Sequence, residues 1–391
     1  MEIELWWLLA LPLFFGLGWA AARVDIRHLV SQSRALPGSY FRGLNFLLNE
    51  EPDKAIDAFI EVVRVDPETI ELHFALGNLL RRRGEIGRAI RMHSSLVNRA
   101  DLDQSERLRA LYELGQDYLK TGLLDRAEET LGKLAATPYA AMARVHLLEI
   151  YQVEKDWDKA IATAHQIEGE SGDSRQKEIA QFHCELAAGA LLRSNAAAAR
   201  EHAEAALKVN RKAVRANIIL GEIEAAAGRH EAAIDCWRRI ETQDPNYLAL
   251  VGGKLMDAYR ALGQAKEGFT LLAGYLERYP SLDLLDLVFD LSVEFSGADQ
   301  AYRLVREEVR RSQTLVGLDR LIEAQLMNAP ADRQADLQLV KHLIHTHARR
   351  LTRYTCENCG FKARQFFWRC PGCAGWETYP PRRAEALDAA G

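Results

Sequence analysis

The sequence has few aromatic residues and no excess of positive charge. Aromatic residues make up 8% of the 391 positions, and 50 Lys and Arg stand against 55 Asp and Glu, a net charge of −5. Nucleic-acid-binding proteins usually carry a basic surface and aromatic side chains on which bases stack. The composition therefore argues against nucleic acid as a partner. With 48% hydrophobic residues, the chain has enough apolar material for a core, which excludes a disordered or collagen-like protein.

The sequence also lacks the short motifs of common enzymes. It has no G-x-x-x-x-G-K-[ST] phosphate loop, no H-E-x-x-H zinc motif, no G-x-S-x-G elbow and no kinase set. His-Cys-Glu at residues 183–185 matches the H-x-E of zinc deaminases, but their P-C-x-x-C is missing, because Arg369 rather than proline precedes Cys370. We therefore expect a protein that is not an enzyme.

One long uncharged stretch lies near the N-terminus. Residues 5–22 carry no charged side chain, and as a helix they would extend about 27 Å, close to the hydrocarbon thickness of a bilayer. Tryptophans stand near both ends of the stretch, as is typical of membrane interfaces: Trp6, Trp7 and Trp19. A cleaved signal peptide is the alternative, since the alanines at residues 20–22 resemble a cleavage site. No Lys or Arg precedes the apolar run, however, which favours a retained anchor.

The charges that follow this stretch set the predicted orientation. Basic residues dominate the next twenty positions: Arg23, Arg27, Arg34 and Arg42. By the positive-inside rule, the N-terminus lies outside and the remainder of the chain is cytoplasmic. The sequence thus predicts a single transmembrane helix over residues 1–23.

Residues 36–350 are predicted to form helical repeats. Apolar residues recur at helical spacing without strand-like alternation. A small residue follows a turn at intervals of 33 to 39 residues, and we call these eight positions the anchors: Ala55, Ala89, Ala127, Ala160, Ala199, Ala233, Gly268 and Ala301. Glycines stand twelve residues before four anchors, and prolines twelve residues after three: Gly43, Gly77, Gly115, Gly221, Pro67, Pro245 and Pro280.

This period has a physical reason. Small residues let the two helices of a hairpin approach closely, and a hairpin that cannot bury its apolar face alone stacks on its neighbours. The pattern resembles the tetratricopeptide repeat. We expect an all-α superhelix of eight or nine repeats, whose groove suits an extended peptide or a helix from a partner protein.

The C-terminal region is predicted to bind one metal ion. Four cysteines form two C-x-x-C pairs separated by ten residues: Cys356, Cys359, Cys370 and Cys373. Two such pairs place four thiolates around one point, with Gly360 and Gly372 supplying the tight turns. Disulfides or a thioredoxin-like pair are the alternatives.

Residues 354–381 resemble rubredoxin or a short zinc ribbon. The metal is zinc or iron, and a closed four-sulfur site favours structure over catalysis. Four aromatic residues are expected to pack over the site: Phe366, Phe367, Trp368 and Trp376. Residues 382–391 are predicted to be a disordered tail.

Two further groups of residues have unremarkable predicted roles. Cys184 and Cys236 lie on predicted repeat helices, and we expect them to be inert apolar residues. Three histidines stand before the ribbon among arginines, at His342, His345 and His347. They are metal ligands, a lipid-facing patch or a solvated helix face, and the last interpretation is favoured.

Together, the span, the repeats and the cysteine pairs resemble the lipopolysaccharide assembly protein B family of bacterial inner-membrane proteins. The likeness covers nearly the whole chain and is strongest over residues 37–59 and 354–373. It implies a non-enzymatic adaptor that restrains lipopolysaccharide synthesis. Such an adaptor works with a membrane AAA+ protease that degrades the deacetylase committing precursors to lipid A.

The resemblance also implies another inner-membrane regulatory partner and docking of the ribbon against the repeats. On this basis, the groove would capture the deacetylase, while the span and first repeats would touch the protease. Two alternatives stay open. One is a membrane-tethered scaffold for envelope assembly complexes, and the other is a redox or metal-sensing module.

Overall fold

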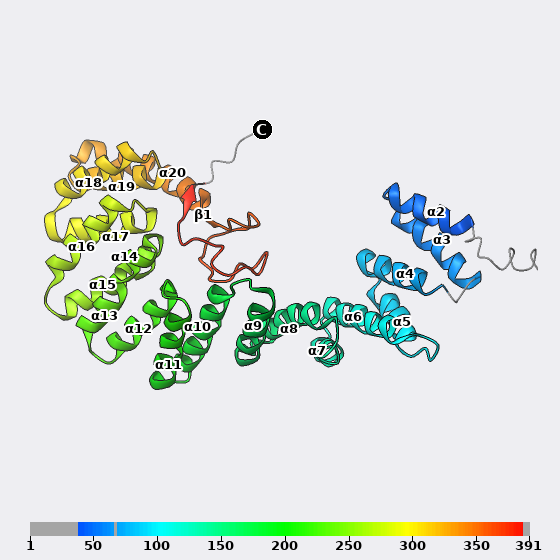
Figure 1. Ribbon diagram of the computed structural model, residues 1–391. Coiled ribbons are helices and arrows are strands. Elements are labelled where there is room, and N and C mark those ends of the chain that lie inside the picture. Colours follow the sequence, from blue (N-terminus) through cyan, green and yellow to red (C-terminus); the bar gives the residue numbers. More distant parts are fainter. Residues whose placement is uncertain (1–37, 66–68, 386–391) are drawn as a thin grey trace, which may run out of the picture. The chain divides into compact units, whose positions relative to one another are not determined.

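The computed structural model describes residues 38–65 and 69–385 (Figure 1). The predicted transmembrane helix at residues 1–23 lies outside this part of the chain, and so does Pro67, which was predicted to end a helix. Among the helices that the structure describes, none has the length and apolar character needed to cross a membrane.

The chain divides into two compact units, which meet between Ile150 and Tyr151. The helices of the first unit are α2 (Gly38–Leu48), α3 (Pro52–Val65), α4 (Ile70–Arg83), α5 (Ile86–Val97), α6 (Gln104–Thr121) and α7 (Leu124–Gly132), and α8 (Ala140–Glu154) spans the boundary. Those of the second unit are α9 (Trp157–Ser171), α10 (Gln176–Leu192), α11 (Ala196–Val209), α12 (Val214–Ala226), α13 (His230–Arg238), α14 (Ile240–Gln243), η1 (Pro245–Tyr247), α15 (Leu248–Ala261), α16 (Ala265–Arg278), α17 (Leu282–Ser296), α18 (Ala298–Arg311), α19 (Leu315–Met327) and α20 (Ala331–Leu351).

Local sequence sets where these helices begin and end. α6 starts after Asp103, whose side chain accepts a hydrogen bond from the backbone N–H of Glu106. It ends at Gly122, which has a φ of 74°, a left-handed conformation that glycine adopts without a Cβ clash.

The helices pair into hairpins, and the anchors mark the second helix of each one. They fall in α3, α5, α7, α9, α11, α13, α16 and α18, and each of the seven alanine anchors is 0% exposed. α19 and α20 form a further pair after the last anchor. The prediction of stacked tetratricopeptide-like hairpins is therefore confirmed.

The predicted glycines are required by the close approach of the paired helices. A Cβ atom on any of the four would collide with the side chain sixteen residues later, and the four pairs are Gly43 with Phe59, Gly77 with His93, Gly115 with Leu131, and Gly221 with Trp237. The large side chain of the second helix thus lies directly against the glycine backbone of the first.

One of these four large side chains, His93, is polar and belongs to a buried network in the first unit. His93 and Asp117 are both fully buried, with Nδ1 of His93 2.6 Å from Oδ2 of Asp117. Arg81 donates to Oδ1 of Asp117 at 2.9 Å and lies 2.5 Å from Oε2 of Glu113. Each buried charge therefore faces an opposite charge, which offsets its loss of water. The network joins α4, α5 and α6.

The C-terminal ribbon follows α20 without a linker. It contains β1 (Thr352–Thr355), β2 (Lys362–Ala363) and β3 (Ala384–Glu385) in the antiparallel order β2-β1-β3. Disorder was expected from residue 382, but β3 pairs with β1, which orders the chain as far as residue 385.

The histidines of α20 lie on a solvated helix face. His342, His345 and His347 are all exposed, and Nδ1 of His345 lies 2.9 Å from Oδ2 of Asp319. Within the described residues, they belong to no cluster able to hold a metal ion.

We predict that Gly221→Ala destabilises the second unit by about 1–3 kcal/mol, because the new methyl group collides with the indole of Trp237. Gly253→Ala is the matched control, since no atom lies within 4 Å of its Cβ position in helix α15. That control is expected to be neutral or stabilising by up to about 1 kcal/mol. Chemical denaturation measures both, and equal stabilities would contradict the packing argument.

Candidate metal centre

The ribbon brings the four predicted cysteines together. Their Sγ atoms all lie within 4.8 Å of one another, and all four thiols are free of disulfides. Cys356 and Cys373 are 3.8 Å apart, and Cys359 and Cys370 are 3.7 Å apart. Four sulfurs at about 2.3 Å from one ion in a tetrahedron lie about 3.8 Å from each other. The arrangement fits a zinc or iron ion held by four thiolates, and these residues would supply all of its ligands.

The two C-x-x-C turns share one backbone pattern. The N–H of Gly360 donates to the carbonyl of Cys356, and that of Ala374 donates to the carbonyl of Cys370. The N–H of Cys356 donates to Phe361, and that of Cys370 to Gly375, so the two turns are related position by position. In each, the first cysteine is buried and the second is more exposed.

The prediction that glycines supply the tight turns was right for Gly360 and wrong for Gly372. Gly360 has a φ of 73°, and at the equivalent position of the second turn Ala374 has a φ of 56°. Gly372 is instead packed tightly, since a Cβ there would lie 3.1 Å from Cβ of Phe361 and 3.3 Å from Sγ of Cys359. Gly372 is thus required for space rather than for a left-handed backbone.

Hydrogen bonds prepare Cys356 to act as a thiolate. Burial raises the pKa of its thiol, but the Thr378 hydroxyl and the backbone amides of Cys359 and Asn358 outweigh it and lower the pKa to about 6. The Thr378 oxygen lies 3.4 Å from Sγ. A thiolate at neutral pH is the form that binds metal.

A small aromatic core supports the centre. Tyr379 is fully buried, and its hydroxyl donates to the carbonyl of Tyr354 at 3.0 Å. Phe366 and Phe367 pack against its ring, at centroid distances of 6.4 and 5.8 Å. The expectation for these two phenylalanines agrees with the structure.

The two tryptophans of the ribbon have a different role from the one expected. Trp376 faces α9 and α10, where its ring meets Trp157 and Phe182 edge-on at 6.1 and 5.9 Å. Its Nε1 donates to Oε1 of Gln152 at 3.0 Å. The neighbouring Glu377 accepts from Nε2 of Gln181 at 2.7 Å. Trp376 therefore docks the ribbon onto the repeats instead of covering the metal.

Trp368 docks the ribbon further along the second unit. It stacks on Tyr247 with centroids 5.3 Å apart and planes 9° apart, and the guanidinium of Arg215 lies 5.4 Å from its ring. Arg215 is itself held by Glu185 at 2.7 Å. Stacking and cation–π contacts of this kind each contribute about 0.5–2 kcal/mol.

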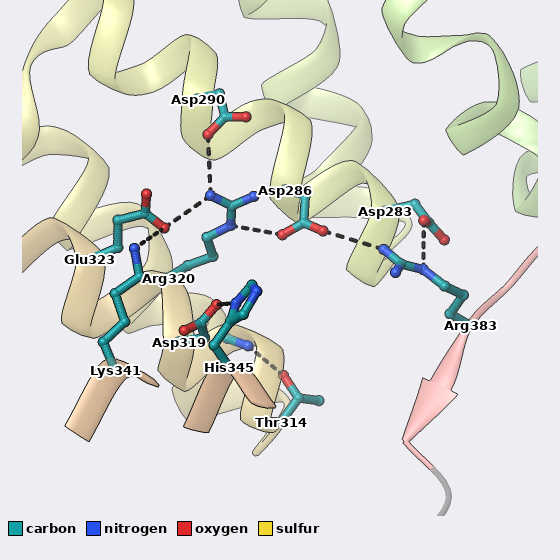
Figure 2. Close-up of polar contacts among 11 residues, drawn as sticks. Asp283, Asp286, Asp290, Thr314, Asp319, Arg320, Glu323, Lys341, His345 and Arg383 are labelled. Carbon is teal, nitrogen blue, oxygen red and sulfur yellow. Dashed lines mark hydrogen bonds and ion pairs between the residues drawn. The ribbon is translucent and has the colours of Figure 1, made fainter. Parts of the chain in front are cut away.

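The end of the ribbon is fixed by charge. Arg383, just before β3, pairs with Asp283 at 2.7 Å and Asp286 at 3.3 Å, both on α17 (Figure 2). Asp286 also accepts from Arg320 of α19 at 2.8 Å. Burial raises the pKa of Asp283, while Arg383 favours its charged form. In Figure 1 the orange and red ribbon lies within the curve of the second unit, and its contacts reach from α8 to α17.

Most of the docking residues on the repeats were missed by sequence reasoning. Gln181, Arg215 and Tyr247 carry no local signal, because their partners lie more than a hundred positions later. The three aspartates of α17 do carry one, since Asp283, Asp286 and Asp290 recur at i, i+3 and i+7 and so share one helix face.

The remaining cysteines are as expected. Cys184 is 0% exposed on α10, and burial raises the pKa of its thiol to about 12. Cys236 on α13 is half-buried, and burial raises its pKa as well. Neither thiol is activated for chemistry.

Comparison with known proteins places the chain among metal-ribbon repeat proteins. Residues 354–380 match the family described as rubredoxin metal binding domain, and residues 42–91 and 185–247 match tetratricopeptide repeat. Lipopolysaccharide assembly protein B of Escherichia coli K12 is 31% identical over 97% of this chain and 98% of its own length. The chain belongs to the lipopolysaccharide assembly protein B family.

Other similar proteins include a second relative of the same name and a solved structure. Lipopolysaccharide assembly protein B of Haemophilus influenzae is 29% identical over 97% of this chain and 98% of its own length. Among solved structures, the TPR2AB domain of yeast Sti1 is similar at 18% identity and a TM-score of 0.31, covering 69% of this chain and 97% of that one.

We predict that Cys356→Ser releases the metal ion and unfolds the ribbon, while the helices survive, because so small a domain depends on metal for its folding. Trp368 and Trp376 would then become solvated, which shifts tryptophan fluorescence to longer wavelength. Elemental analysis measures the metal, circular dichroism the helices, and visible absorbance separates oxidised iron from colourless zinc.

Cys236→Ser is the matched control, since Cys236 lies on α13 outside the four-thiol group, and full metal content is expected. Unchanged metal content in Cys356→Ser would refute the assignment of the centre.

Proposed function

We propose that this protein is an inner-membrane adaptor that restrains lipopolysaccharide synthesis. In this role it promotes degradation, by a membrane AAA+ protease, of the deacetylase that commits precursors to lipid A. The observation that carries the proposal is the 31% identity over 97% of the chain to proteins named lipopolysaccharide assembly protein B. Tetratricopeptide repeats support it, because repeat surfaces of this kind bind proteins.

The docked ribbon occupies part of the repeat surface, which restricts where a partner protein would bind. It contacts α10, α12 and α17, which are first helices of hairpins in the second unit, and also Trp157 at the start of α9. We therefore assign capture of the deacetylase to the corresponding face of the first unit, on α4 and α6. Arg82 and Lys120 mark this face, since each stands five residues after a close-packed glycine, about 140° around the helix, and both are exposed.

The predicted transmembrane helix supplies the second part of the proposal. A span over residues 1–23 would confine the repeats to the plane in which the membrane protease lies. Confinement raises the effective concentration of one partner for the other without any new contact. The N-terminus would then be periplasmic, and the repeats and ribbon cytoplasmic.

We predict that deleting residues 1–22 leaves the repeats and ribbon folded but stops turnover of the deacetylase. Pulse–chase labelling in cells that carry only the truncated protein measures the half-life. A half-life equal to that with the full chain would contradict a need for membrane tethering.

We predict that the double variant Arg82→Glu and Lys120→Glu lengthens the half-life of the deacetylase to the value found in cells depleted of this protein. Reversing two charges on the proposed capture face would turn attraction to an acidic partner surface into repulsion. The matched control is Arg126→Glu with Lys133→Glu, two exposed cations at the second helix of a hairpin, which is expected to leave turnover unchanged.

The baseline is the half-life of the deacetylase on depletion, with and without the protease. Stabilisation only when the protease is present supports the adaptor. An unchanged half-life would favour the envelope-assembly scaffold instead, and visible absorbance from an iron-bearing ribbon would favour the redox module.

A further inference from the structure

The last anchored hairpin contains a buried acid at a position that is apolar elsewhere. Seven residues after each anchor stands a buried side chain, and the eight are Val62, Leu96, Leu134, Ile167, Ala206, Ile240, Tyr275 and Glu308. Glu308 is the single acid in this series and is 8% exposed. With Ala301 and Val305 it completes the buried stripe of α18. Packing alone calls for an apolar residue there.

Glu224 is another buried acid of the chain, and unlike Glu308 it has ion-pair partners. That residue is 7% exposed on α12, and its carboxylate pairs with Arg200 at 2.5 Å and with Arg229. Within the part of the chain that the structure describes, the carboxylate of Glu308 has no such ion pair and accepts no hydrogen bond. Burial raises its pKa, and Arg311 opposes this only at a distance. By comparison with Glu224, Glu308 lacks, among the described residues, a cation in direct contact with its carboxylate.

A cavity lies beside Glu308. It has a volume of about 670 Å³ and is bounded by α16, α17 and α18, with Phe269, Ala273 and Leu276 among its apolar walls. Three glutamates and two arginines line it, so its side chains carry a net charge of 2 − 3 = −1. The cavity is therefore both large enough and suitably charged for a small cationic ligand.

A second departure from the repeat pattern opens this cavity. Nine residues before each anchor, the side chains are mostly large: Phe46, Leu80, Tyr118, Tyr151, Ala190, Glu224, Tyr259 and Ser292. Ser292 lines the cavity from α17, is 0% exposed, and its hydroxyl has no hydrogen-bond partner among the described residues. Buried polar groups are nearly always paired, so the unpaired buried hydroxyl of Ser292, beside a carboxylate that no described residue pairs with, points to a ligand.

We propose that this cavity binds an alkylammonium group. The carboxylate of Glu308 accepts from the ammonium head, the hydroxyl of Ser292 accepts a further hydrogen bond from it, and the apolar walls surround the alkyl chain. The same chemistry is offered by a free polyamine and by a lysine side chain of a partner polypeptide.

Calorimetric titration of the full-length protein in a neutral detergent tests the proposal with two probes. Spermidine represents the free polyamine, and N-acetyl-lysine methylamide represents the lysine side chain. Glu308→Gln keeps the shape of the side chain and is expected to weaken binding by about tenfold or more, the usual effect of losing a charged hydrogen-bond partner.

Glu307→Gln is the matched control. Glu307 lines the same cavity from the next position of α18 but is exposed, so its loss removes equal charge without a buried partner. Binding within about twofold of the unsubstituted protein is expected, since screened surface charges contribute little. Preference for one probe identifies the source of the ammonium group.

A third variant separates binding from folding. Glu308→Leu restores the apolar residue of the other hairpins and is expected to abolish binding while raising the melting temperature by about 2–4 °C. The proposal would be overturned if neither probe binds, if Glu308→Gln and Glu307→Gln weaken binding equally or not at all, or if Glu308→Leu lowers the melting temperature.

Discussion

The close approach of two helices within each hairpin is the constraint on which the rest of the structure depends. Every alanine anchor is fully buried, and four glycines lie directly against a large side chain of the partner helix. Backbones at this distance leave no room for an extra methyl group. The hairpins can then stack, and the first helices of the second unit are held in a fixed row. That row is the surface on which the ribbon docks.

Sequence alone predicted the elements that depend on short-range order. The anchor spacing identified the hairpins, and the two C-x-x-C pairs identified the four thiols, because both signals lie within a few tens of residues. The partners of Trp368 and Trp376 were not predictable in this way, since Tyr247 and Phe182 lie more than a hundred residues earlier. Nothing in the ribbon sequence distinguishes an aromatic residue that covers metal from one that faces another domain.

Positions at which a hairpin departs from the repeat pattern say more about function than positions that follow it. His93, Glu224 and Glu308 all place a polar group where neighbouring hairpins hold, at most of the equivalent positions, an apolar one. His93 is paired with Asp117, and Glu224 is paired with two arginines, so each of these polar groups has its partner within the protein. At Glu308 the described chain supplies a cavity in place of a partner. Burial without compensation is what distinguishes a site from a structural ion pair.

The ribbon also changes how the repeats are connected. In a repeat array each hairpin touches only its neighbours, so such proteins tend to lose structure piece by piece. Here a hydrogen bond joins Gln152 to Trp376, 224 residues later, while Arg383 reaches back to α17. A contact of this range closes the second unit into a loop, and the loop holds only while the ribbon is folded. A metal ion that folds the ribbon would thereby couple hairpins of the second unit that do not touch one another.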